Sequence, residues 1–521
     1  MIWRTATLLS MDRSEKRNLT LVLAVAFLAS LAWCLTKGRM VEGDDAIMGL
    51  MALKISRGEE FPIFFWQAHY SGPIASYLAA PLHWLFAPSP IVLHSVIIPI
   101  HMVYSAGMYF LARSWLGQRE AMMAGLFAAL PGQLFPYSAL GGFTESMAFV
   151  PWIFLLCLGE SNNSKSQRLR FLFGGFLCGF ALWVFPLAFP PVLASLICQQ
   201  RAYGRKPLRL SLAGCFIGLL PVIHHNISQP GATILRLFAR PSALDRQAAS
   251  HILSSDGIIS LFLQLLEKWA YNSYQALLSL PQFTLSLLGW APDATVWGRI
   301  SGLINLSVLL FALWTFLRYR GNKKAIPRAV LLTAIITYCF VVLFGLNRDR
   351  YLIPMLLLIP FGLALAIQRI AGFLDRRVST AAVAFILLIN GLADFWDTQT
   401  RYPDYHGLAR FLQFNGLISG YASYTTAYPL VYLSNERLIY TPAFDDSQYD
   451  RHAEYTAHVA RAEKPTFVFS DQRNADRFRR GLGALNTSSK ERAWGPFRVF
   501  HDLSPQVDIE RLRSATATPT N

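Results

Sequence analysis

Long apolar runs separated by short basic segments dominate the first 394 residues of the chain. A helix needs about 20 apolar residues to cross the hydrocarbon core of a bilayer, and about eleven runs reach or approach that length. The predicted spans are 19–36, 91–112, 120–137, 144–159, 171–185, 186–199, 210–225, 300–317, 328–346, 351–368 and 378–394. Within 171–199, Pro186, Pro190 and Pro191 predict a break between two short helices. The pattern predicts an α-helical, multi-pass membrane protein.

The pattern changes after residue 394. Short runs typical of strands alternate there with helical stretches. The predicted strands are near 418–423, 437–440, 466–469 and 497–500, and the predicted helices are near 405–415, 446–461 and 472–481. Alternating strands and helices favour a small α/β domain. We therefore expect a transmembrane domain over 1–394 and a soluble domain over 395–521.

The basic residues predict which side of the membrane each loop faces. Lys and Arg cluster at the N-terminus and in alternate turns between the predicted spans, as the positive-inside rule expects of cytoplasmic segments. An odd number of spans then places two large loops, 37–90 and 226–299, and the tail on the extracytoplasmic side. Two short apolar stretches, at 257–266 and 277–288, are expected to lie in the membrane interface. The predicted location is a cell inner membrane or plasma membrane.

Composition supports this class and excludes others. The chain is 53% hydrophobic and only 15% charged, with a mean hydropathy of +0.35. Its net charge of +16 follows the topology, because residues 395–521 hold 15 basic and 14 acidic residues and offer no basic stripe for nucleic acid. The six cysteines all lie in apolar segments, which excludes a disulfide framework or a zinc motif. We expect the bilayer, and no nucleic acid, as a partner.

The most informative polar residues open the first large loop. Asp44 and Asp45 stand at the start of a segment whose apolar residues, Ile47, Leu50 and Met51, repeat at helical spacing. Acids are favoured in the first turn by the helix dipole, so one interpretation is that Asp44 merely caps a helix on the membrane surface. The alternative is a catalytic base with a supporting carboxylate. Successive helical residues point about 100° apart, so the two acids should have different roles.

This arrangement resembles the GT-C superfamily of polyprenyl-phosphate-dependent glycosyltransferases. A first span, an outer loop opening with two acids, an aromatic stretch from Phe65 to Tyr77 with Gly72-Pro73, and a C-terminal soluble domain are all similar to the branch of protein O-mannosyltransferases and aminoarabinose transferases. The later stretch has Gln67 and His69 where the relatives commonly carry a Glu. The resemblance implies a hexosyl- or pentosyltransferase of the cell envelope. It would move one monosaccharide from a polyprenyl-phosphate donor to an extracytoplasmic glycan, lipid or protein by direct displacement.

The resemblance also implies roles for individual residues. Asp44 would be the general base and Asp45 its supporting carboxylate, while cations hold the departing phosphate. The candidate substrate-binding residues are Lys54, Arg57, His69, Tyr70, Glu145, Arg348, Arg350 and Tyr351. For the cations the alternative is simple snorkelling to the headgroups. The base requires no metal and no metal ligands are assigned, although two acids beside a phosphate could recruit Mg²⁺ or Mn²⁺.

Glu145 lies in an otherwise uncharged outer turn, where a carboxylate needs a structural or functional partner.

Two other functions are alternatives to a glycosyltransferase. A polytopic lipid or sugar transporter would place ionisable residues at mid-span, often in paired repeats. A non-catalytic subunit of a cell-envelope assembly complex would use the tail to bind a partner and would tolerate loss of the acid pair.

Overall fold

The structure is a computed structural model of the chain. It describes residues 11–36, 38, 40–130, 141–159, 164–233, 267, 270–282, 284, 296–317, 325–344, 346, 349–370, 385, 389, 403–444 and 450–516. Contacts between Cα atoms divide the chain into two compact units. The helical unit comprises Met1–Trp33, His69–Ile74 and Ile97–Gln399, and the loop–tail unit comprises Cys34–Ala68, Ala75–Val96 and Thr400–Asn521. The predicted domain boundary at residue 394 lies outside the described residues.

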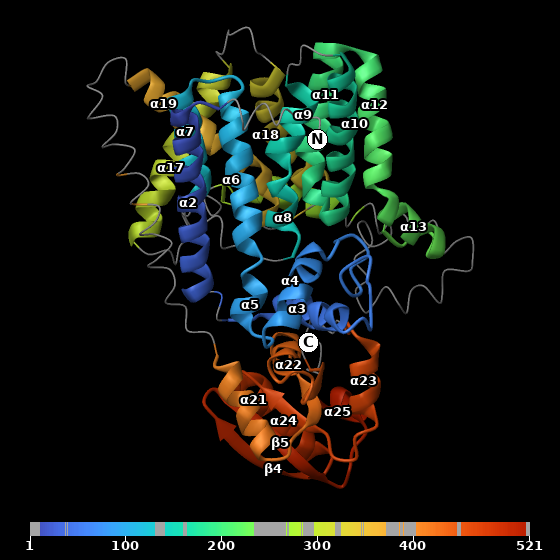
Figure 1. The fold of residues 1–521 in the computed structure, drawn as a ribbon. Helices are drawn as coiled ribbons and strands as arrows, with labels where there is room; N and C mark the ends of the chain where they lie inside the picture. Colours follow the sequence, from blue (N-terminus) through green and yellow to red (C-terminus); the bar gives the residue numbers. More distant parts are fainter. Residues whose placement is uncertain are drawn as a thin grey trace. The chain divides into compact units, whose positions relative to one another are not determined.

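The helical unit is a bundle of apolar helices (Figure 1). Its described elements are α2 (Arg13–Thr36), α6 (Ile97–Arg113), α7 (Gln118–Ala129), α8 (Phe143–Ala148), α9 (Val150–Leu158), α10 (Ser164–Val184), η4 (Pro186–Ala188), α11 (Phe189–Tyr203), α12 (Arg205–Gly218), α13 (Leu220–Ser228), α17 (Val296–Leu317), α18 (Ala325–Leu343), η5 (Asp349–Leu357) and α19 (Leu358–Ile370). The predicted break near Pro186 is confirmed, because α10 ends at Val184 and α11 begins at Phe189.

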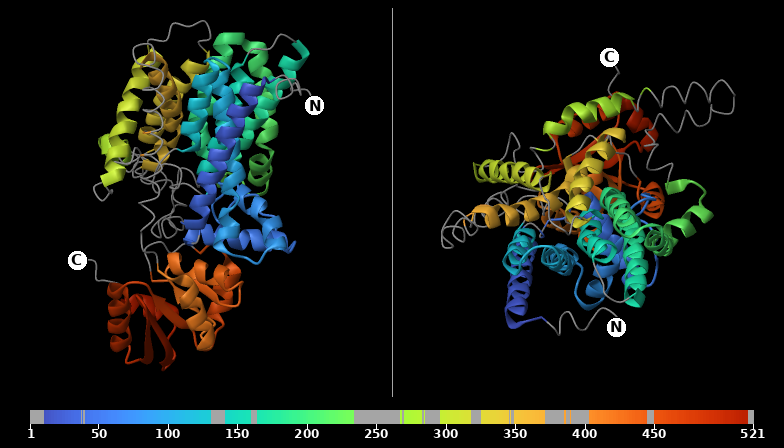
Figure 2. Two further views of the ribbon diagram at one scale, coloured as in Figure 1. Left: turned by 60° about the vertical axis from the view of Figure 1, so that its left-hand side comes forward. Right: turned by 90° about the horizontal axis from the view of Figure 1, so that it is seen from above.

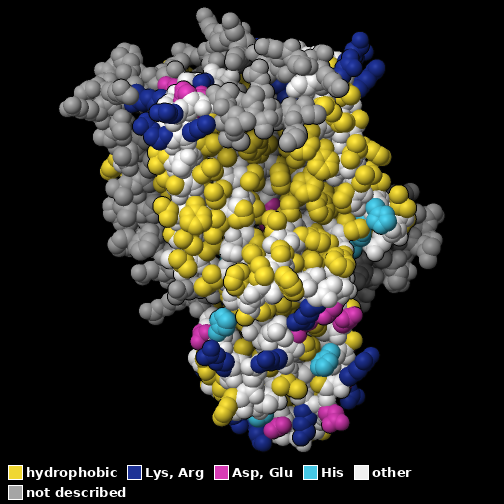
Figure 3. All heavy atoms as spheres, in the orientation of Figure 1, with side chains coloured by type: hydrophobic (Ala, Val, Ile, Leu, Met, Phe, Trp, Pro, Cys, Tyr) yellow, Lys and Arg dark blue, Asp and Glu magenta, His cyan; other side chains and the backbone are white. Residues whose placement is uncertain are grey.

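Several helices have the length and composition of membrane spans. Within the described residues, Arg13–Thr36, Pro90–Arg113 and Ala325–Leu343 meet both criteria, and α12 with α13 forms a fourth candidate bent by 53°. In Figure 3, hydrophobic side chains cover most of the visible face of the helical unit. A mostly helical, membrane-type unit is therefore confirmed, whereas the count of about eleven spans stays a prediction. The stretch 257–266 lies outside the described residues, and so does the span predicted at 378–394 except for residues 385 and 389.

The loop–tail unit combines three helices of the first loop with the α/β tail. The loop contributes α3 (Gly43–Ser56), α4 (Ile74–Leu85) and α5 (Pro90–His94). The tail contributes α21 (Tyr405–Phe414), β1 (Ser419–Ala422), α22 (Tyr424–Leu433), β2 (Ile439–Pro442), α23 (Ala453–Ala460), β3 (Thr466–Phe469), α24 (Gln472–Ala484), β4 (Ser488–Trp494), β5 (Phe497–Ser504) and α25 (Ile509–Thr516). Figure 2 shows the red strands of the tail with its orange helices. The predicted α/β tail is confirmed.

The five strands form one sheet in the order β2-β1-β3-β5-β4. The first three are parallel, and Tyr421 of β1 lies opposite Thr441 of β2 and Phe467 of β3. Strands β5 and β4 run antiparallel to their neighbours. Strand β1, which lies between the two other parallel strands, is buried throughout, as expected of a parallel strand covered on both faces. The edge strand β4 is mostly exposed, and its charged side chains oppose pairing with another chain.

Helix α3 of the loop packs against α22 of the tail, and two glycines allow this close approach. A Cβ on Gly43 would lie 2.6 Å from a ring carbon of Tyr424, and a Cβ on Gly49 would lie 2.5 Å from a ring carbon of Tyr432. Both distances are too short for any side chain larger than hydrogen. Residues 46–53 of α3 are all buried. Helix α3 is therefore buried within the loop–tail unit, and its polar side chains lie at its two ends.

Candidate active site

Asp44 lies in the first turn of α3, where its carboxylate is exposed. The N-cap position belongs to Glu42, whose side chain makes no capping hydrogen bond. The oxygen Oδ1 of Asp44 accepts a short hydrogen bond from the hydroxyl of Tyr424 in the tail. Among the described residues of the loop–tail unit, Oδ2 of Asp44 has no hydrogen-bond partner. The Asp44 carboxylate therefore accepts a hydrogen bond at Oδ1, while Oδ2 is exposed and has no such partner in the described part of the unit. This differs from a capping carboxylate, which accepts from backbone N–H groups of the first turn.

Tyr424 is the first residue of α22, directly after β1 and Ser423. Burial and then the negative charge of Asp44 raise the pKa of the Tyr424 phenol well above its usual value. The phenol therefore stays neutral and donates its proton to Asp44. Its oxygen also lies 3.3 Å from Nε of Arg451, which has no acceptor atom. Because a hydroxyl has a single proton, Tyr424 accepts from Arg451 and donates to Asp44, and the direction of the two hydrogen bonds is fixed.

Arg451 is held by groups from both the loop and the tail. Its Nη1 donates to the backbone oxygen of Trp66 over 3.3 Å, and its guanidinium lies 5.3 Å from the centroid of the Phe65 ring. Its backbone N–H donates to the hydroxyl of Tyr428 over 2.6 Å. Cation–π contact and hydrogen bonds of this kind keep a planar guanidinium in one orientation. The tail therefore presents a fixed cation beside the hydroxyl that contacts Asp44.

The segment around Trp66 is itself anchored to the tail. The indole Nε1 of Trp66 donates to Oε2 of Glu60 over 3.0 Å, and Nε2 of His452 lies 3.2 Å from Oε1 of the same carboxylate. The rings of Trp66 and His452 have centroids 4.3 Å apart, and His452 is equally close to Tyr455. This packing fixes the position of the carbonyl that accepts from Arg451.

Asp45 has a different environment, as the helical geometry predicts. Its Oδ2 lies 3.4 Å from Nε2 of His94, which is buried. The other ring nitrogen, Nδ1 of His94, lies 2.9 Å from the backbone oxygen of Gly38. Two hydrogen-bonding groups thus orient the imidazole toward Asp45. Within the described part of the chain, no three His, Cys, Asp or Glu side chains gather as metal ligands.

Lys54 and Arg57, at the other end of α3, pair with carboxylates. Lys54 lies 2.9 Å from Glu59 and 3.6 Å from Glu436, and Arg57 makes a short ion pair with Glu436. Burial favours the neutral form of Glu436, but the hydrogen bond from Tyr455 and the two cations outweigh it and lower its pKa. Burial likewise opposes the charge of Lys54, yet Glu59 and Glu436 raise its pKa. Both cations therefore tie the loop to the tail.

A second group of predicted residues meets in the helical unit around Phe143. The guanidinium of Arg350 lies 5.2 Å from the Phe143 centroid, and the ring of Tyr351 lies 6.4 Å from it. Phe185 packs between Phe143 and Tyr70, at centroid distances of 4.3 and 6.0 Å. Three predicted residues, Tyr70, Arg350 and Tyr351, thus join one aromatic cluster.

Glu145, two residues after Phe143, is a capping residue in this structure. It is 1% exposed, and its Oε2 accepts from the backbone N–H of Gly142 over 3.0 Å at the start of α8. A backbone N–H group at the start of α8 therefore provides a hydrogen-bond partner for the buried carboxylate of Glu145.

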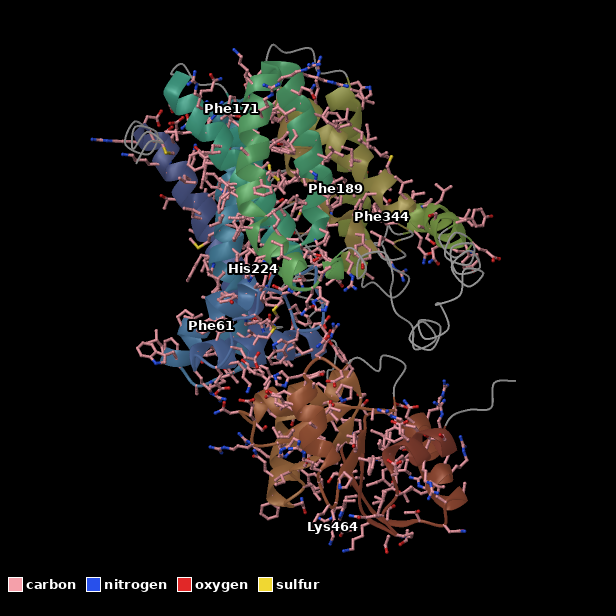
Figure 4. All side chains as sticks on the ribbon, turned by 90° about the vertical axis from the view of Figure 1, so that its right-hand side faces the viewer. Phe61, Phe171, Phe189, His224, Phe344 and Lys464 are labelled. Atoms are coloured by element: carbon pink, nitrogen blue, oxygen red, sulfur yellow. The ribbon has the colours of Figure 1, made fainter. Side chains whose placement is uncertain are left out.

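His69 contacts His225 of α13 in the same unit. Nε2 of His225 lies 3.1 Å from Nδ1 of His69, and the two rings stack with centroids 5.0 Å apart. His224, labelled in Figure 4, is exposed on the same helix. Arg348 lies outside the described residues.

Tyr424 and Arg451 were not among the residues predicted from the sequence. One available signal was the strand predicted at 418–423, because the carboxyl ends of parallel strands are where α/β sheets present functional groups. Tyr424 stands directly after that strand. No sequence pattern linked it to a loop 380 residues away.

Comparison with solved structures identifies the fold. The chain is similar to ArnT from Cupriavidus metallidurans bound to undecaprenyl phosphate, with a TM-score of 0.64, 12% identity, and coverage of 93% of this chain and 98% of that chain. The apo state of the same protein matches with a TM-score of 0.59 at 12% identity, over 96% and 99% of the two chains.

The archaeal oligosaccharyltransferase AglB from Archaeoglobus fulgidus, in complex with an inhibitory peptide and a dolichol-phosphate, is also similar. It matches with a TM-score of 0.51 and 12% identity, over 90% of this chain and 71% of that chain. Both neighbours belong to the GT-C superfamily, so the chain has the GT-C fold and the predicted resemblance is confirmed at that level. No family model and no curated protein sequence matches the chain.

Proposed function

We propose that this protein is a membrane glycosyltransferase that moves one sugar from a polyprenyl-phosphate donor to an acceptor hydroxyl on the extracytoplasmic side. The observation that carries the proposal is the exposed Asp44 carboxylate, held at Oδ1 and open at Oδ2, in a chain with the fold of ArnT. The neighbours' structures contain undecaprenyl phosphate or dolichol-phosphate, which supports a lipid phosphate as the leaving group. Helices of membrane-spanning length support access to such a donor.

The proposed reaction is a direct displacement at the anomeric carbon. Oδ2 of Asp44 takes the proton of the acceptor hydroxyl while the acceptor oxygen bonds to the sugar carbon. The bond between that carbon and the donor's phosphate oxygen breaks, and the electron pair leaves with polyprenyl phosphate. Asp45, which contacts His94, has the supporting role of holding the first turn of α3 in position. These steps place the proton on Asp44 and the negative charge on the phosphate.

A cation must stabilise that phosphate. We assign this role to Arg350, because a guanidinium offers two parallel donors that match a phosphate. Stacking on Phe143 and Tyr351 fixes its orientation. Lys54 and Arg57 are less suited, because carboxylates of the loop and tail already neutralise them.

The proposal can be tested in cells by following the product. A strain lacking the gene should lose one glycosylated lipid, glycan or protein, and it should accumulate the unmodified acceptor. The wild-type gene should restore the product, and a gene encoding Asp44→Asn should not. The control is that the two complemented strains contain equal amounts of the protein in their membranes. Full restoration by Asp44→Asn would contradict the proposed function and favour a non-catalytic role in an assembly complex.

A further inference from the structure

We propose that the tail completes the catalytic base: Tyr424 is a positioning residue for the Asp44 carboxylate, and Arg451 sets the direction of the Tyr424 hydroxyl. This inference rests on the proposed function, because it concerns the same carboxylate. It assigns to the soluble tail a part in the reaction itself. The supporting observations are the connected hydrogen bonds Arg451 to Tyr424 to Asp44 and the packing that fixes each member.

The hydrogen-bonding capacity of the three groups permits one arrangement. An ionised carboxylate only accepts, and a guanidinium only donates. The hydroxyl between them must therefore accept from Nε of Arg451 and donate to Oδ1 of Asp44. The hydrogen bond at Oδ1 makes that oxygen less basic, so Oδ2 is the oxygen better able to receive a proton. Tyr424 and Arg451 thus favour Oδ2 as the oxygen of Asp44 that takes the proton, and they fix the direction in which Oδ2 points.

Packing leaves the Tyr424 ring little freedom. The ring lies against the backbone of Gly43, where even a methyl group would come within 2.6 Å of it. The centroid of the Tyr424 ring lies 5.4 Å from the centroid of the Tyr428 ring and 5.8 Å from the guanidinium of Arg451. A hydroxyl on so constrained a ring can hold a carboxylate in a single rotamer. Small displacements of a reacting group are costly, since about 1 Å can reduce a rate about 100-fold.

The same helix provides a matched control. Tyr432 lies two turns after Tyr424 on α22 and is buried. Its hydroxyl donates to the backbone oxygen of Ser89 in the loop over 2.9 Å and lies 2.9 Å from Nε2 of His83, also in the loop. Its hydroxyl does not contact Asp44. Tyr432→Phe therefore removes hydrogen bonds between loop and tail, to Ser89 and His83, without changing a contact of the proposed base.

The test measures sugar transfer by the purified full-length protein from a synthetic polyprenyl-phosphate sugar, with kcat and KM for that donor determined separately. Tyr424→Phe should lower kcat by about 10- to 100-fold, with KM changed by less than about 3-fold. Tyr432→Phe should retain the kcat of the wild type. Equal kcat values for Tyr424→Phe and the wild type would overturn the proposal, and so would equal losses in the two Phe variants.

A double-mutant comparison separates positioning from a structural effect. If Tyr424 acts through Asp44, adding Tyr424→Phe to Asp44→Asn should cause almost no further loss in single-turnover rate. A full, multiplicative loss in the double variant would show an independent role and would overturn the inference. Activity retained by Asp44→Asn alone would instead contradict the proposed function, so the two failures are distinguishable.

Arg451→Lys is the second variant, in case Tyr424→Phe does not fold. It keeps the charge and loses the Nε donor and the planar guanidinium that contacts the Phe65 ring. It should lower kcat while leaving KM for the donor close to the wild-type value. A kcat equal to that of the wild type would overturn the role given to Arg451.

Discussion

Arg57 of the first loop makes an ion pair with Glu436 of the tail, a residue whose backbone has a positive φ of 60°. Asn435 adds a hydrogen bond to the same guanidinium over 2.9 Å. Arg57 and Asn435 are 378 residues apart in the sequence, and the ion pair between Arg57 and Glu436 is only partly exposed to solvent. The loop that carries the acid pair therefore depends on the tail for its stability as well as its surroundings.

Glu436→Gln should lower the stability of the loop–tail unit at neutral pH by about 1–3 kcal/mol, because Lys54 and Arg57 lose their shared partner. The pKa of Glu436 is lowered in the folded state, so its charge stabilises the fold above the ordinary value of 4.5. This contribution disappears as the pH falls below 4.5 through the lowered pKa. Thermal unfolding of both proteins between pH 7 and pH 3 should therefore show curves that converge in acid. A constant difference across this range would contradict the role of the charge.

The contact between Asp44 and Tyr424 also makes a prediction about topology. Both residues must lie on one side of the membrane, and the distribution of basic residues predicts that this side is extracytoplasmic. Reporter fusions after Lys54 and after Ala443 should both report an outside location. Fusions on opposite sides would be incompatible with the hydrogen bond and with the expected odd number of spans.

Much of the fold was predictable because its signals are local. The four predicted tail strands correspond to β1, β2, β3 and β5, since apolar and β-branched residues mark them. Strand β4 was missed because its sequence, Ser488 to Trp494, is polar and exposed at the sheet edge. Helix α22 was missed because β-branched residues and Pro429 obscure its helical pattern.

The candidate site was predictable only in part. Asp44 and Asp45 were found because they begin a periodic helix, and their separate surroundings follow from the 100° rotation between neighbours. The partners Tyr424 and Arg451 come from the tail, and such tertiary contacts leave no periodicity in a single sequence. Lys54 and Arg57 looked like phosphate ligands, but their carboxylate partners, Glu59 and Glu436, become evident only in the fold.

Arg350 provides a test of donor binding. Arg350→Lys should partly weaken use of the polyprenyl-phosphate donor, because lysine keeps the charge and loses the guanidinium fork. Arg350→Ala should weaken it strongly. The dependence of the rate on donor concentration, at equal levels of inserted protein, measures both effects. Unchanged kinetics in Arg350→Ala would assign Arg350 to headgroup snorkelling and direct attention to Arg348.

Metal dependence is a further prediction. A carboxylate base that takes a proton directly needs no cation, so transfer by the purified protein should persist in excess EDTA. The control is the same reaction with added Mg²⁺ or Mn²⁺. Activity that EDTA abolishes and either ion restores would instead make the acid pair part of a cation site.

The central claim is that Asp44 is the base, and release of polyprenyl phosphate by purified protein tests it most directly. With donor and acceptor present, Asp44→Asn should release it about 10²- to 10⁴-fold more slowly than the wild type, because an amide keeps the shape of the side chain and loses the base. Asp45→Asn, which alters the contact with His94, should be less severe. This order of release rates is expected when the three proteins have equal thermal stability. Release by Asp44→Asn at the wild-type rate would contradict it.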